Sequence, residues 1–183
     1  MHITFAPRNI LQIDEIDGRD LIFKNFEGRG DKFNREGDRN FSIRLRDPET
    51  ADALVEKGWN VKIKDGRDDD EGPFMRLPVK VKFGDYPPRV YLWSGNRRNE
   101  LDEESIGCLD QIDIESVNMD VSAYNWEVNG RTGRTAYLQT IEVFQRVDRF
   151  EARYANMTDD DKLDFRLGCV TLDREDRRQL FLA

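Results

Sequence analysis

Lysine, arginine and aromatic residues alternate with apolar residues in three runs between residues 59 and 93. The runs are WNVKIK (59–64), FMRLPVKVKF (74–83) and RVYLWS (89–94). Because successive side chains of a β-strand point to opposite faces, each run predicts one apolar face and one cationic or aromatic face. This pattern is typical of a groove for single-stranded nucleic acid. The outward residues that could contact phosphates or bases are Lys62, Lys64, Lys80, Lys82, Arg89, Tyr91 and Trp93.

Aromatic residues in this region have two interpretations, base stacking and ordinary packing. Tyr91 and Trp93 are the first candidates for stacking, because they share a face with Arg89 while their neighbours point inward. A tryptophan in a strand more often belongs to the core. We assign Trp59 to the core, since it shares its face with apolar residues, and for Trp126 both interpretations stay open.

A second basic and aromatic segment is predicted to be a long hairpin. Residues 112–126 and 136–147 are expected to be its strands, and EVNGRTGR lies between them. Asn-Gly and the following glycine supply the turn, while Arg131 and Arg134 supply positive charge. With Trp126 and Tyr137 beside it, this tip could close over a strand of nucleic acid. Arg97, in a predicted loop over 94–107, is a further candidate for backbone contacts.

The elements that must position these residues are mostly short strands. A hairpin of 11–16 and 21–26 is expected through Asp17-Gly18, followed by a loop over 28–39 and a strand over 41–45. The four cations of this loop could reach phosphates or simply face solvent. A helix is predicted to start at Asp47, as N-cap, and to end at Gly58. Together these features indicate an antiparallel all-β fold with little helix.

Composition narrows the class of protein without deciding it. The chain has 183 residues, 36% of them charged, and a formal net charge of −8. This charge argues against coating nucleic acid with the whole surface, although a local basic groove remains compatible with it. No hydrophobic segment is long enough to cross a bilayer and no secretory signal is recognisable, so a cytoplasmic location without membrane contact is expected.

Residues for catalysis or metal binding are not grouped in any recognisable motif. Cys108 and Cys169 match no metal-ligand spacing, and His2 is the single histidine, in a terminus that we expect to be mobile. The acidic run 68–71 is better explained as a solvated loop than as a cation site, because consecutive carboxylates cannot all converge on one ion. We therefore expect no metal, no cofactor and no enzymatic activity.

Four strings resemble the single-stranded DNA-binding proteins of tailed bacteriophages and prophages. They are GWNVKIK, PVKVKFGDYPPRVYL, WEVNGRTGRTAYLQT and FEARYA, and the resemblance spans residues 23–155. It implies an OB-fold over residues 1–155, here an antiparallel five-stranded barrel with long hairpin extensions and one inserted helix, followed by an extension over 156–183. It also implies DNA binding without strong sequence preference at the matching positions: Lys62, Lys64, Lys80, Lys82, Arg89, Tyr91, Trp93, Trp126, Arg131, Arg134 and Tyr137.

The resemblance further implies a role in phage DNA replication, recombination or repair in the host cytoplasm. Single-stranded DNA would be the main partner, and self-association is possible in such a protein. The extension over 156–183 either recruits replication or recombination proteins or docks on a barrel. The main alternative is a structural or interaction component of a phage particle, because such proteins are also acidic and rich in hairpins.

Overall fold

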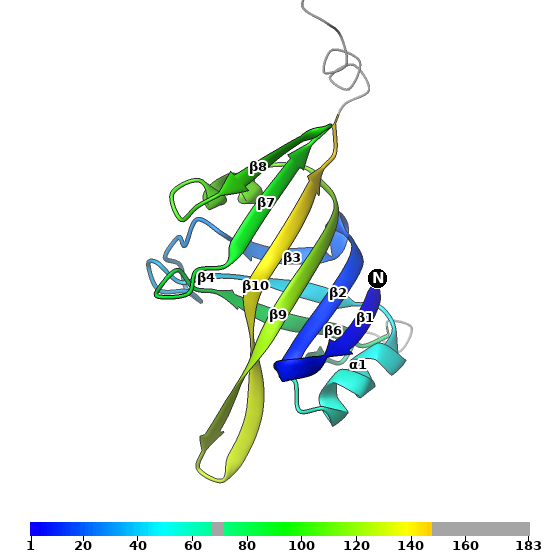
Figure 1. The fold of residues 1–183 in the computed structure, drawn as a ribbon. Helices are drawn as coiled ribbons and strands as arrows, with labels where there is room; N and C mark the ends of the chain where they lie inside the picture. The colour runs from blue at the N-terminus through cyan, green and yellow to red at the C-terminus, as the bar shows by residue number, and fades with distance from the viewer. Residues whose placement is uncertain (67–71, 148–183) are drawn as a thin grey trace, which may run out of the picture. The chain divides into compact units, whose positions relative to one another are not determined.

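The computed structural model describes residues 1–66 and 72–147. In these residues strands predominate and there is one α-helix (Figure 1). The predicted extension over 156–183 and the acidic run 68–71 lie outside the described residues. The elements are β1 (His2–Ala6), β2 (Ile10–Asp17), β3 (Leu21–Asn25), β4 (Arg39–Leu45), α1 (Pro48–Glu56), β5 (Lys62–Lys64), β6 (Phe74–Val81), β7 (Arg89–Ser94), β8 (Arg97–Leu101), β9 (Ile114–Val128) and β10 (Arg131–Gln145), with short 3₁₀ turns at Pro7–Asn9, Gly18–Asp20 and Ile106–Asp110.

All ten described strands belong to one sheet. Its main path is β1-β2-β9-β10-β6-β4-β3, with β5 beside β6, β7 beside β10 and β8 beside β7. Neighbouring strands are antiparallel, except that β10 runs parallel to both β6 and β7. The inward side chains of the sheet form the core, which includes Leu11, Ile43, Leu77, Val90, Val117 and Ile141. The prediction of an all-β fold with a single helix is confirmed.

Strands β6 and β7 are not neighbours, which corrects the expectation that the three runs between 59 and 93 form adjacent strands. Strand β10 pairs with β6 at Ala136 and Tyr137, and with β7 from Thr140 to Phe144. The two strands therefore lie beside successive parts of β10 (Figure 1). Strand β5 does pair with β6 as expected, although it covers only Lys62–Lys64.

The N-terminal region also differs from its prediction. Strand β2 pairs with β1 and β9, while β3 pairs with β4, so the expected hairpin of 11–16 and 21–26 is wrong. Asp17 caps a 3₁₀ turn by accepting a hydrogen bond from the Arg19 N–H at 2.9 Å, and this turn redirects the chain away from β2. His2 lies in β1, opposite Asp14, rather than in a mobile terminus.

Helix α1 follows its prediction closely. The Asp47 carboxylate accepts hydrogen bonds from the backbone N–H groups of Glu49 and Thr50, which satisfies two donors of the first turn. These bonds and one from the Thr50 hydroxyl lower the pKa of Asp47. Gly58 ends the helix with φ +81°, a conformation that favours glycine. Ala51 and Leu54 face the core, whereas Val55 is exposed.

The alternation in β6 is confirmed. Its inward residues Met75, Leu77, Val79 and Val81 are all buried. Trp59 is 4% exposed, as expected for a core residue. The alternation predicted for 59–64 fails at Ile63, which is 52% exposed because β5 is short and lies at an edge of the sheet. The region predicted as a loop over 94–107 contains strand β8, which pairs with β7.

Candidate nucleic-acid interface

The outward face of β6 carries a row of polar and aromatic side chains. Since Met75 to Val81 alternate inward, Phe74, Arg76, Pro78 and Lys80 point outward, and Lys82 follows directly after the strand. Neighbouring strands widen this row, because residues opposite each other in an antiparallel pair share a face. We call the whole set the β6 strip: Phe74, Arg76, Pro78, Lys80 and Lys82, with Lys62 and Lys64 from β5 and Asn40, Ser42 and Arg44 from β4.

Phe23 of β3 joins one end of the β6 strip through an irregular backbone. The pairing of β3 with β4 shifts register between Ile22 and Asn25, and Phe23 adopts φ +52°. Such a bulge turns a side chain away from the face that simple alternation gives it. The Phe23 ring is 63% exposed, and its centroid lies 6.4 Å from that of Phe74 at an interplanar angle of 75°. Two aromatic rings thus meet edge to face at the surface.

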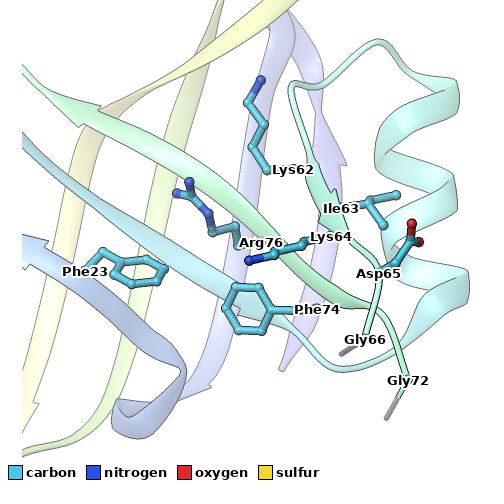
Figure 2. A pocket seen from close by; sticks show the side chains of 9 residues that line it. All are labelled: Phe23, Lys62, Ile63, Lys64, Asp65, Gly66, Gly72, Phe74 and Arg76. Atoms are coloured by element: carbon cyan, nitrogen blue, oxygen red, sulfur yellow. The ribbon is translucent and has the colours of Figure 1, made fainter. Parts of the chain in front are cut away.

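A pocket of about 600 Å³ lies around these rings (Figure 2). Phe23, Phe74 and Arg76 contribute to its lining, together with Lys62 and Lys64 of β5. Asp65 is the carboxylate in the described part of this lining. The pocket therefore combines two ring surfaces with three cationic groups, which are the components that bind bases and phosphates of a single strand.

Arginines of the β6 strip lie over the two rings. The Arg76 guanidinium is 5.1 Å from the Phe23 centroid, and that of Arg44 is 5.5 Å from the Phe74 centroid. Arg76 Nη1 also donates a hydrogen bond to Ser42 Oγ at 2.7 Å. These contacts hold planar, permanently charged groups beside the rings, where they can donate to phosphate oxygens.

The other end of the β6 strip reaches β9 and β10. Lys80 pairs with Tyr137, and its Nζ lies 6.0 Å from the Tyr137 ring centroid. A second pocket of about 530 Å³ is lined by Lys82, Tyr86, Tyr124 and Tyr137, among other residues. The structure therefore gathers five of the predicted residues on one surface: Lys62, Lys64, Lys80, Lys82 and Tyr137.

The predicted stacking residues of β7 lie on a different part of the outer surface. We call this the β7 patch: Arg89, Tyr91 and Trp93 of β7, with Arg98 of β8 and Phe144 of β10. The Trp93 and Phe144 rings stack with centroids 6.1 Å apart and planes 10° apart. The Arg98 guanidinium lies 3.8 Å from the Tyr91 centroid. Arg97 begins β8 and is exposed at this end of the sheet.

The long hairpin is present, but its tip differs from the prediction. Strands β9 and β10 extend to Val128 and Arg131 and leave a turn of two residues, Asn129 and Gly130, both with positive φ (Figure 1). Arg131 lies at this turn. Arg134 lies on the face of the hairpin opposite to that of Arg131. Its backbone N–H donates to Gly58 O, and its C=O accepts a hydrogen bond from the Asn60 N–H. The two arginines are therefore not grouped together.

Trp126 lies on the same face of this hairpin as Tyr124 and Tyr137. It is opposite Gly133, and a Cβ built on that glycine would lie 2.6 Å from the Trp126 ring. The indole therefore covers the partner strand, and only glycine leaves room for it. Trp126 is half-buried. It is therefore neither a fully buried core residue nor a fully exposed stacking residue, the two interpretations that the sequence left open.

Two of the four cations predicted for the loop over 28–39 form ion pairs with residues outside it. Arg29 forms an ion pair with Glu27, and Arg39, at the start of β4, forms one with Glu103 at 2.8 Å. Asp31 accepts hydrogen bonds from the backbone N–H groups of Phe33 and Asn34, which lower its pKa. Of the two interpretations of this loop, the contacts favour a structural one for Arg29 and Arg39.

Sequence reasoning did not single out four residues of the candidate interface: Phe23, Phe74, Arg44 and Arg76. Arg76 and Phe74 could have been found, because each is an even number of residues from Lys80 in the same run and therefore points outward with it. Phe23 could not, since alternation from Leu21 places it inward and only the bulge exposes it. In residues 1–66 and 72–147, no group of three or more His, Cys, Asp or Glu could hold a metal ion, and no helix is long and apolar enough to cross a membrane.

Comparison with known proteins places this fold in a family. Residues 5–169 match the family model described as "Putative phage ssDNA-binding domain". Among solved structures, the single-stranded DNA-binding protein of bacteriophage Enc34 in complex with ssDNA is similar at 14% identity and a TM-score of 0.51, over 81% of this chain and 93% of that one. A C-terminal truncation of the Enc34 protein matches at 13% identity and a TM-score of 0.49, over 79% of this chain and 90% of that one.

No curated protein matches the chain in sequence. The likeness to the Enc34 complex agrees with the expected OB-like architecture of a β-rich fold with one helix. The family model covers most of the 183 residues. The chain therefore belongs to the family of phage single-stranded DNA-binding domains.

Proposed function

We propose that this protein binds single-stranded DNA along the β6 strip, without strong sequence preference. Phe23 and Phe74 serve as stacking platforms for bases, while Lys62, Lys64 and Arg76 contact phosphates. The observation that carries this assignment is Phe23, an exposed aromatic ring held beside a second ring and beneath an arginine by a left-handed backbone conformation.

Energetics support this choice of site. A base stacked on an aromatic side chain contributes about 1–3 kcal/mol, whatever the base, because every base has a π-face. A non-glycine residue at positive φ costs roughly 1–3 kcal/mol and persists where its surroundings enforce it, often at binding sites. An exposed phenylalanine in that conformation gains little from burial. Its position is more easily explained by a ligand than by packing.

The remaining predicted residues receive different weights in this proposal. Lys80, Lys82 and Tyr137 belong to the same surface and extend the interface along β6. Smaller contributions are assigned to residues outside the β6 strip, which a bound strand would reach only at its margins: Arg89, Tyr91, Trp93, Arg97, Trp126, Arg131 and Arg134.

The biological setting follows from the family. We propose a binding protein rather than an enzyme or a structural component of the phage particle, acting on DNA during phage replication, recombination or repair. Its place of action would be the host cytoplasm, where phage DNA is copied. Recruitment of other replication or recombination proteins through residues 156–183 stays a prediction, because this segment lies outside the described residues.

The test is a binding titration of a labelled thymidine oligonucleotide, followed by fluorescence anisotropy at low and moderate salt. Phe74→Ala should raise the Kd by about 5-fold to 150-fold through the loss of one stack. Phe5→Ala is a matched control, because Phe5 is also exposed with a lysine over its ring, but it lies on β1 at the far end of the strand order. Absence of binding by the unaltered protein at low salt would refute the proposal.

A further inference from the structure

We infer that the β6 strip has a second base-stacking site at its other end, formed by Tyr124 and Tyr137. A single strand would bridge this site and the Phe23–Phe74 pair, and its central nucleotides would contact the protein through phosphates alone. The inference rests on the proposed function. It adds the path of the DNA along β6, the minimum length of DNA that reaches both sites, and the nucleotides that are bound through their bases or through their phosphates.

The two aromatic pairs have nearly the same geometry. The Tyr124 and Tyr137 centroids are 6.1 Å apart at 78°, compared with 6.4 Å and 75° for Phe23 and Phe74. Tyr124 is 63% exposed, the same fraction as Phe23. Each pair has at least one cation near its rings: Arg76 by Phe23 and Arg44 by Phe74 in the first pair, and Lys80 by Tyr137 in the second. Each pair also lines a pocket of similar size, about 600 Å³ and about 530 Å³.

Strand β6 connects the two pairs on one face. Phe74 is its first outward residue, and Lys80, near its end, lies beside Tyr137 in the parallel pairing with β10. Tyr137 is opposite Ser122 in β9, so Tyr124, two residues further along β9, shares the same face. Ala136, directly before Tyr137, is buried, which fixes the outward direction of the tyrosine.

The middle of the path offers charge and polar groups rather than rings. Between Arg76 and Lys80 the outward residue of β6 is Pro78, which is opposite Ser42 of β4. The next pair along is Lys80 with Asn40. Bases have no aromatic platform here among the described residues, whereas phosphates have Arg76 and Lys80. A strand crossing this section would therefore be held by its backbone.

The spacing sets the length of DNA required. Phe74 and Lys80 are six positions apart in β6, and a strand advances about 3.3 Å per residue, which gives roughly 20 Å between the two pairs. A nucleic-acid strand stacked as in duplex DNA advances about 3.4 Å per nucleotide, so about six nucleotides fill this interval, and a more extended strand needs fewer. An oligonucleotide of eight thymidines is long enough to reach both sites.

The experiment moves a block of two abasic nucleotides along this octamer and measures the Kd by anisotropy at each position. The unaltered protein should lose affinity by about 5-fold or more when the block lies towards either end and should lose little when it is central. Tyr124→Ala should abolish the penalty at one end only, and Phe74→Ala the penalty at the other. The end of the octamer, 5′ or 3′, at which each variant loses its penalty would also show in which direction the DNA runs along β6.

Two controls separate this inference from the proposed function. Phe5→Ala should retain both penalties, because this exposed ring is outside the β6 strip. A uniform penalty at all positions, or a Tyr124→Ala profile identical to that of the unaltered protein, would overturn the second site while leaving DNA binding intact. Failure of the unaltered protein to bind the unmodified octamer would instead refute the proposed function.

Discussion

The β6 strip and the β7 patch have similar composition but differ in what their rings already contact. Both combine outward aromatics with lysine or arginine, and both follow from the same alternation in sequence. In the β7 patch, Trp93 is stacked on Phe144 with nearly parallel planes. In the β6 strip, Phe23 and Phe74 meet edge to face, which leaves ring surface for a base. Alternation alone therefore identifies outward aromatics but not available ones.

Charge and burial separate the two regions further. Tyr91 is flanked in the sheet by Glu100 of β8 and Glu142 of β10, so carboxylates share its face. Trp93 Nε1 is buried and has no hydrogen-bond partner among the described residues. The outward residues of β6 and their partners on β4 and β5 include no carboxylate. Phosphates would thus meet repulsion beside Tyr91 and attraction along β6.

The largest expected effect is on stacking. The double variant Phe23→Ala/Phe74→Ala should raise the Kd for oligo(dT) at least about 30-fold, because two stacks are worth about 1–3 kcal/mol each. Tyr91→Ala/Trp93→Ala should raise it less than about 5-fold, since Phe144 is stacked on Trp93 and Arg98 lies 3.8 Å from the Tyr91 centroid, closer than the 5.1 Å and 5.5 Å of the arginines beside Phe23 and Phe74. Anisotropy titrations at one salt concentration measure both. The reverse order of effects would move the binding site to β7.

A smaller effect is expected on salt dependence. Arg76→Gln/Lys80→Gln removes two charges of the β6 strip. The slope of the logarithm of the association constant against the logarithm of the salt concentration should become less steep by about 1.4, because each phosphate contact on a single strand contributes about 0.7 to it. Arg89→Gln/Arg97→Gln removes two exposed charges near the β7 patch and should change the slope by less than about 0.5. Equal slopes for the two variants would contradict the distinction between the regions.

The features predicted correctly from the sequence are those set by residues close to one another in the chain. The inward residues of β6 follow from the two-residue period of a strand. The ends of α1 follow from its capping residues, because Asp47 lies directly before its first residue and Gly58 lies just after its end. The pairing of β10 with β6 and then with β7 is set by contacts between residues distant in sequence, so no local pattern reveals it. The two runs were therefore wrongly placed side by side.

The position of Phe23 shows a second limit. Leu21 is inward, and a regular strand would place Phe23 inward as well, yet the bulge before Asn25 exposes it. The side chain of Asn25 donates to the backbone oxygens of Arg29 and Asp38, and its Oδ1 accepts from the Arg29 N–H. These bonds anchor the chain after the bulge. These hydrogen bonds form only when the loop after β3 has its folded conformation, and that conformation cannot be predicted from the residue types alone.

Stability offers a third comparison of the two regions. Phe144→Ala removes the ring stacked on Trp93 and should lower the free energy of unfolding by about 1–2 kcal/mol through lost apolar contact and ring stacking. Phe23→Ala removes a largely exposed ring and should change it by less than about 0.5 kcal/mol. Urea unfolding followed by circular dichroism measures both. A loss at Phe23 as large as that at Phe144 would indicate that Phe23 is a packing residue rather than a binding residue.

The smallest effect tests the backbone of Phe23 directly. Left-handed backbone costs an L-residue roughly 1–2 kcal/mol but costs glycine almost nothing, whereas glycine loses about 0.5–1 kcal/mol more than alanine in conformational entropy on folding. Phe23→Gly should therefore be about 0.5 kcal/mol more stable to urea than Phe23→Ala, while both variants lose DNA affinity equally because both lack the ring. If alanine is the more stable of the two, the left-handed conformation costs little at this position, and strain no longer supports a binding role. If glycine is the more stable, the left-handed conformation carries a cost at this position, which supports a binding role for the Phe23 ring.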